Sequence, residues 1–122
     1  MEADRITLTT RLAGSCTVVT AVGDIDLATA PQLRACLSAA IDADAQALVI
    51  DVTGVGFLDS TGIGVLIGAW NRLGSRPDAI TLVGASPLVR RVLQLTAIDR
   101  IFTLRDRLPE AVGVVTKPEL AP

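Results

Sequence analysis

The sequence contains no histidine and no tyrosine, and its aromatic residues are two phenylalanines and one tryptophan. Without histidine the chain cannot build a Ser-His-Asp or Cys-His catalytic arrangement, and most zinc sites are excluded as well. With so few aromatic rings, a platform for stacking nucleic-acid bases is not expected. The net charge of −2 also argues against a dedicated nucleic-acid-binding protein, which usually carries a basic stripe.

Cysteine and long apolar runs are scarce too. Cys16 and Cys36 are too few for the disulfide framework of a small secreted protein, so we expect both to be reduced and to serve packing. The most apolar run, residues 62–70, is too short to span a bilayer. The first ten residues carry charges and lack the apolar core of a signal peptide. We therefore expect a cytoplasmic protein that does not interact with a membrane.

What the chain does have is a composition suited to folding. Half of its 122 residues are hydrophobic and a fifth are charged, which excludes a disordered chain. The length fits one domain with one core. We expect a single domain over residues 1–122, with a core of about 5–112. Residues 113–122 are expected to form a loose tail.

Hydrophobic periodicity predicts an α/β fold. Alternating and β-branched runs predict strands over residues 6–10, 16–22, 47–50, 80–83 and 101–104. Apolar residues at helical spacing predict helices that begin near residues 30, 60 and 87, and a last helix over 106–112. The order is ββαβαβαβα, which corresponds to a mixed sheet of about five strands with about four helices. After the opening hairpin the strands should be mostly parallel.

The stretch Asp59-Ser60-Thr61-Gly62 lies where the loop after the third strand meets the second helix. Ser60 is a natural N-cap, and on spacing alone capping is a sufficient reason for a serine there. Gly62 in the first turn is expected to leave Ser60 open to something large. Gly64 and Gly68 are four residues apart, and their usual purpose would be close packing of the helix on the sheet.

Two catalytic interpretations of this stretch fail. The order around Ser60 is not the Gly-x-Ser-x-Gly of a nucleophile elbow, and no histidine is present to act as its base. Gly54 and Gly56 are not followed by the Gly-Lys-Ser/Thr of a phosphate-binding loop. What remains is a hydroxyl on which another protein acts.

The run Phe57-Leu58-Asp59-Ser60-Thr61-Gly62-Ile63-Gly64 closely resembles the signature of the STAS family, the bacterial anti-sigma factor antagonists. Gly23-Asp24-Ile25-Asp26 is similar to a second motif of that family. The resemblance extends over about residues 5–112. One departure is Ala97, where the family often has glycine. Alanine tolerates a left-handed helix end poorly, so we expect the end of the third helix to differ locally.

The resemblance implies a single STAS-like domain and a role in partner switching. The unphosphorylated protein would bind an anti-sigma factor that is also a serine kinase, and so release the sigma factor. The kinase would phosphorylate Ser60, with Thr61 as the alternative acceptor, and a serine phosphatase would reverse the modification. The expected partner-binding residues are Asp24, Asp26, Asp59, Ser60, Thr61 and Gly62. No cofactor, metal or enzymatic activity is expected.

Several alternatives stay open at this point. Asp24 and Asp26 could be ordinary turn and capping residues, and Asp59 could either cap the helix or position the Ser60 hydroxyl. The chain could instead be a STAS module of a transporter or of a stressosome-type scaffold. A small enzyme that uses Ser60, Asp24 and Asp59 is the least favoured alternative, because the chain lacks histidine and a phosphate-binding loop.

Overall fold

A computed structural model describes residues 5–108 of the chain. It has one five-stranded sheet whose strands lie in sequence order, β1-β2-β3-β4-β5. The strands are β1 (Thr7–Ala13), β2 (Cys16–Val22), β3 (Ala47–Gly54), β4 (Ile80–Val83) and β5 (Thr103–Arg105). The helices are α1 (Ala30–Asp42), α2 (Ser60–Arg72) and α3 (Pro87–Leu95), followed by a 3-10 turn over Ile98–Arg100.

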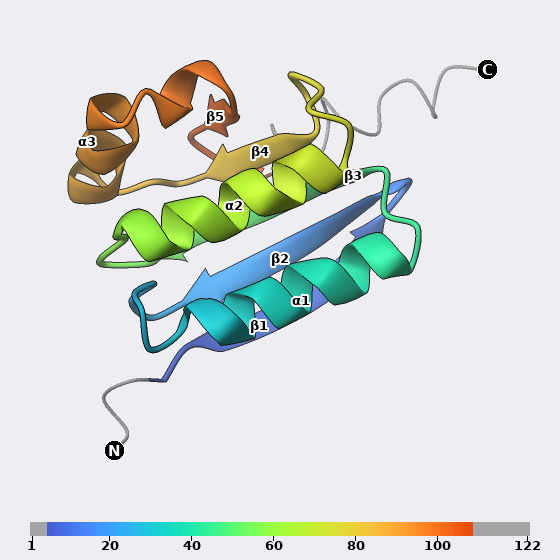
Figure 1. The fold of residues 1–122 in the computed structure, drawn as a ribbon, viewed down its shortest axis with the longest axis horizontal. Coiled ribbons are helices and arrows are strands. Elements are labelled where there is room, and N and C mark those ends of the chain that lie inside the picture. The colour runs from blue at the N-terminus through green and yellow to red at the C-terminus, as the bar shows by residue number, and fades with distance from the viewer. Residues whose placement is uncertain (1–4, 109–122) are drawn as a thin grey trace.

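The connections agree with the predicted α/β topology. β1 and β2 form an antiparallel hairpin, and all later neighbours are parallel. Figure 1 shows α1 and α2 side by side on one face of the sheet, both running in the same direction. Because each parallel strand leads into a helix at its carboxyl end, the loops before α1, α2 and α3 gather at one edge of the fold (Figure 1).

The main core fills the space between the sheet and its helices. Alternate residues of β2, β3 and β4 point into it, and Leu33 and Leu37 of α1 meet Ile63 and Leu66 of α2 there. A second, smaller cluster lies on the other face of the sheet. Its buried members are Cys16, Val18, Ala47, Val49 and Val83, and Leu108 packs against them.

Three predicted strand boundaries need correction. The first strand is Thr7–Ala13 and not 6–10, because all of its residues pair with β2. β3 continues to Gly54, past the predicted end at Ile50, because it keeps pairing with β2. The last strand is Thr103–Arg105 and not 101–104, because the Ile101 and Phe102 amides donate to the Ile98 carbonyl and close the 3-10 turn. The predicted last helix, 106–112, and the tail, 113–122, fall largely outside the described residues.

The third helix has the predicted start and an unexpected end. The Ser86 hydroxyl caps it by accepting a hydrogen bond from the Val89 amide at 3.2 Å. Beyond it, Ala97 adopts the left-handed conformation, with φ of 61°. The expected local departure is therefore wrong, since alanine takes the geometry that glycine would favour and bears its steric cost.

Cys16 and Cys36 form no disulfide with each other in the structure, and their reduced state in the cell stays a prediction. Cys16 is buried in the smaller cluster, and Cys36 lies partly buried on the apolar side of α1. Burial raises the pKa of the Cys36 thiol, so the thiol stays protonated and weakly nucleophilic near neutral pH. No helix in residues 5–108 is long and apolar enough to cross a membrane.

Candidate functional site

The two sequence motifs meet at the edge of the sheet where Ser60 lies. The loop after β2 and the loop after β3 are joined by a short parallel bridge between Ile25 and Leu58. The Ile25 amide donates to the Phe57 carbonyl at 2.8 Å, and the Asp59 amide donates to the Ile25 carbonyl at 3.1 Å. These bonds fix the Gly-Asp-Ile-Asp segment beside the start of α2.

Asp59, and not Ser60, caps α2. Its carboxylate accepts hydrogen bonds from the Thr61 amide at 2.9 Å and the Gly62 amide at 3.2 Å, and its backbone is extended. Ser60 is therefore the first residue inside the helix. The capping interpretation of Ser60 is wrong, because the preceding aspartate already satisfies the free amides of the first turn.

Because Asp59 supplies the cap, the Ser60 hydroxyl is not needed to stabilise the start of α2. Ser60 is exposed, and its hydroxyl forms no hydrogen bond with any residue in the described part of the chain. It stands at the N-terminus of a 13-residue helix, where the partial positive charge of the helix favours an anion. A group added to this oxygen would extend into solvent and would not displace an internal contact.

Asp24 and Asp26 lie in the same loop but play different parts. The Asp26 carboxylate accepts hydrogen bonds from the Ala28 and Thr29 amides, so it organises the turn into α1. Asp24 is exposed, and its carboxylate lies over Gly56 in the loop before α2, at 3.4 Å from where a Cβ atom would stand. Asp24 is thus available at the surface, while Asp26 holds the loop.

The glycines of α2 do not behave as their spacing suggested. Gly62 is buried, and a Cβ atom there would lie 2.4 Å from Ile25 Cγ2 and 2.7 Å from Leu58 Cδ1. It does not open space around Ser60 but lets α2 sit tightly on the two bridged loops. Gly64 and Gly68 are exposed, and a Cβ atom at either would meet nothing within 4 Å. The expected role of these two glycines in close packing is wrong.

Three large apolar side chains are exposed on the segments that lead into the helices at this edge. Leu27 in the loop before α1, Phe57 in the loop before α2 and Leu88 in the first turn of α3 are all large and exposed. Exposed large apolar side chains that gather at one place on a soluble protein commonly mark an interaction site. The positions of Leu27 and Phe57 in loops that follow strands, and of Leu88 at the start of a helix, were the available signal. The described residues include no cluster of His, Cys, Asp and Glu suited to a metal ion.

Comparison with known proteins agrees with the fold and the site motif. The family model of the STAS domain matches residues 7–111, and the chain belongs to the STAS domain family. It is similar to the anti-sigma-B factor antagonist of Listeria monocytogenes, with 33% identity over 84 residues, covering 69% of this chain and 74% of the relative. The anti-sigma-F factor antagonist RsfB of Mycobacterium tuberculosis is 30% identical over 109 residues, covering 89% of this chain and 88% of the relative.

A solved structure gives the same result. The crystal structure of an anti-sigma factor antagonist from Mycobacterium paratuberculosis superposes with a TM-score of 0.83 at 34% identity. The match covers 92% of this chain and 95% of that structure. The predicted STAS-like fold and the family assignment are confirmed.

Proposed function

We propose that this protein is an anti-sigma factor antagonist that works by partner switching. Its unphosphorylated form binds an anti-sigma factor and thereby frees a sigma factor, and phosphorylation of Ser60 ends that binding. The observation that carries the proposal is the exposed Ser60 hydroxyl, which forms no hydrogen bond with residues 5–108 because Asp59 caps the helix in its place. The names of the relatives from Listeria and Mycobacterium support the same class of partner.

The chemistry of the switch follows from the position of Ser60. A serine kinase transfers the γ-phosphoryl group of ATP to the Ser60 oxygen, so the new P–O bond forms as the bond to ADP breaks and the hydroxyl proton is released. The phosphate adds a charge of about −1.5 to −2 at pH 7. A helix N-terminus accommodates an anion, so the fold is retained. The change is in the surface presented to the partner.

Local charge makes that surface change large. The carboxylate of Asp59 adjoins Ser60, and the exposed Asp24 belongs to the loop bridged to the same segment. A partner that fits this face already faces these two acidic groups. Adding a phosphate places further negative charge and bulk in the middle of the contact, which a closely fitted interface cannot pair.

The expected site residues then have distinct roles. Ser60 is the acceptor, and Asp24 contacts the partner together with Leu27, Phe57 and Leu88. Asp26, Asp59 and Gly62 act through structure, by holding the loop, capping α2 and allowing α2 to pack. Thr61 is partly buried in the first turn and remains the alternative acceptor.

The proposal assigns the covalent chemistry to other proteins. The anti-sigma factor is itself the serine kinase, and a separate serine phosphatase restores the free hydroxyl. This chain is their substrate and binding partner, not an enzyme, and it works in the cytoplasm, where sigma factors act.

The test is capture of partners from native cytoplasm by the full chain carrying Ser60→Ala or Ser60→Glu, followed by mass spectrometry. We expect Ser60→Ala to retain an anti-sigma factor and Ser60→Glu to retain much less of it. The captured factor with ATP should then phosphorylate the wild-type chain at Ser60. Equal capture by both variants, with no phosphate on Ser60, would contradict the proposal. Transfer to Thr61 would move the acceptor by one residue.

A further inference from the structure

The three glycines of α2 divide into two kinds. Gly62 is required by the packing around Ile25 and Leu58. Gly64 and Gly68 face open space, so alanine would fit at both positions and would favour the helix. The contacts of α2 with the rest of residues 5–108 therefore give no reason for glycine at residues 64 and 68.

These two glycines line a groove between α1 and α2. The groove has a volume of about 170 Å³. Its apolar lining comes from both helices and consists of Leu37, Ile41, Val65 and Ala69. Because α1 and α2 lie side by side and run in the same direction (Figure 1), the groove follows their length. Any side chain at residue 64 or 68 would project into it.

The two ends of the groove differ in charge. At the far end Arg72 of α2 pairs with Asp42 of α1 at 2.7 Å, which joins the helices and neutralises both groups. Arg34 also lines the groove, and it makes no ion pair or hydrogen bond with any residue from 5 to 108. It lies one turn into α1. Gly64 lies one turn into α2, immediately after the turn that begins with Ser60.

We propose that this groove receives an acidic, apolar-faced segment of the anti-sigma factor. The segment's backbone lies against Gly64 and Gly68, its apolar side chains enter the groove, and a carboxylate pairs with Arg34. Because Gly64 and Gly68 have no side chains, the backbone of a partner segment can come close to α2 there. The guanidinium of Arg34 can form a bidentate pair with a carboxylate of that segment. The inference rests on the proposed function, because it extends the contact that begins at Ser60.

The size of the groove supports an extension and not a separate interface. A stable protein–protein contact buries about 1,200–2,000 Å² in total, far more than so small a groove can supply. Ser60, Gly64 and Gly68 follow one another at intervals of four residues in α2, so they share one face of the helix and the groove extends the contact that begins at Ser60. The apolar lining, and the Arg34 guanidinium that has no partner among the described residues, define the chemistry of the occupant as acidic and apolar.

The experiment measures the affinity of the unphosphorylated full chain for the captured anti-sigma factor by calorimetric titration. Gly68→Gln fills the groove, and we expect it to weaken binding at least tenfold while its melting temperature equals or exceeds that of the wild type. Ala35→Gln is the matched control, because Ala35 is exposed on α1 outside the groove. It should bind within twofold of the wild type.

A charge-reversal pair tests Arg34 separately. Arg34→Glu should weaken binding at least tenfold, and Arg11→Glu, the same change on the exposed β1, should bind within twofold of the wild type. If Gly68→Gln and Arg34→Glu bind like the wild type while Ser60→Glu does not, the groove is not part of the contact and the proposed function stands. If Ser60→Glu also binds like the wild type, the proposed switch at Ser60 fails instead.

Discussion

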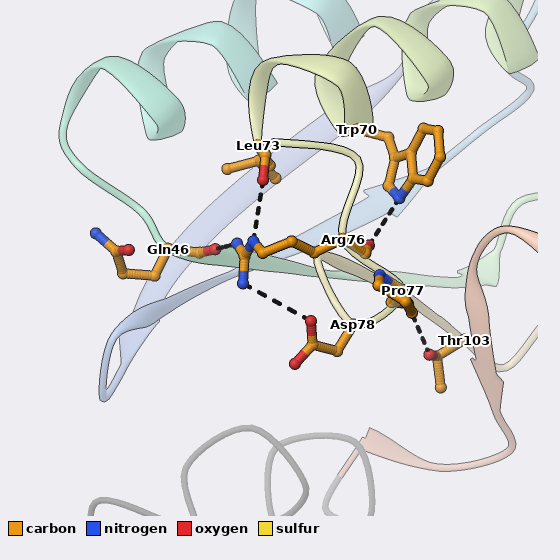
Figure 2. Close-up of polar contacts among 7 residues, drawn as sticks. All are labelled: Gln46, Trp70, Leu73, Arg76, Pro77, Asp78 and Thr103. Atoms are coloured by element: carbon orange, nitrogen blue, oxygen red, sulfur yellow. Dashed lines mark hydrogen bonds and ion pairs between the residues drawn. The ribbon is translucent and has the colours of Figure 1, made fainter.

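The two ends of α2 are built for opposite purposes. At its C-terminal end, Figure 2 shows Arg76 among backbone carbonyls: its guanidinium donates to those of Leu73 and Gln46 and pairs with Asp78. The Trp70 ring nitrogen donates to the Arg76 carbonyl at 2.8 Å, so the turn is held from both sides (Figure 2). At the N-terminal end, Ser60 is exposed and its hydroxyl bonds to no described residue.

The difference shows how one helix can be fixed firmly in the fold at one end and present a modifiable hydroxyl at the other. At the C-terminal end, the polar groups form hydrogen bonds and an ion pair within the chain. These contacts fix the end of α2 in place. At the N-terminal end, Asp59 and Gly62 do the fixing, and Ser60 is left to the solvent. Substitutions of the residues that fix α2 should therefore change stability strongly, and substitutions of Ser60 only weakly.

The largest effect is expected at Gly62. Gly62→Ala places a methyl group against Ile25 and Leu58, and overpacking should lower the free energy of unfolding by about 1–3 kcal/mol. Gly64→Ala is its control two residues on, and should raise the free energy of unfolding by about 0.5–1 kcal/mol. Urea denaturation of both variants measures the contrast. Equal effects would show that the two glycines do not differ in their surroundings.

Arg76→Ala should come next. It removes two hydrogen bonds to backbone carbonyls, and we expect it to lower the free energy of unfolding by about 1–2 kcal/mol. Arg72→Ala breaks only the exposed pair with Asp42 and should cost about 0.2–1 kcal/mol. Arg76→Ala should leave partner affinity unchanged, because Arg76 lies beyond the C-terminal end of α2 and does not line the groove. A loss of affinity in the folded variant would contradict the separation of roles.

The cap offers the finest comparison. Asp59→Ala should lower the free energy of unfolding by about 1 kcal/mol, and Asp59→Asn should recover most of it, because asparagine also caps. Ser60→Ala should change it by no more than about 0.5 kcal/mol, as an exposed surface substitution does. Thermal and urea unfolding distinguish the two. If Ser60→Ala lowered the free energy of unfolding more than Asp59→Ala does, Ser60 and not Asp59 would be the residue that caps α2.

Much of the fold could be predicted because its causes are local. Alternating and helical periodicities placed the strands and helices, and the Ser86-Pro87 start of α3 follows from capping chemistry. The end of β3 and the position of β5 depend on pairing with distant strands and on a 3-10 turn, which no local pattern contains.

The candidate site was predictable in content but not in detail. The motif located Ser60, but Asp59 and Ser60 are both good caps, and the choice between them is made by the bridge from Ile25 to Leu58. Ile63, Leu66 and Trp70 recur at helical spacing and define the buried face of α2. Gly64 and Gly68 fall outside that face. From the rotation of each residue around the helix axis, the sequence could have predicted that these two glycines lie on the surface.

Partner switching at Ser60 can be tested by a calorimetric titration of the anti-sigma factor with two forms of the full chain, unphosphorylated and phosphorylated at Ser60. Mass spectrometry confirms the modified residue, and circular dichroism confirms that both forms are folded. Phosphorylation should weaken binding by at least a hundredfold without loss of structure. Equal affinity of the two folded forms would contradict this prediction.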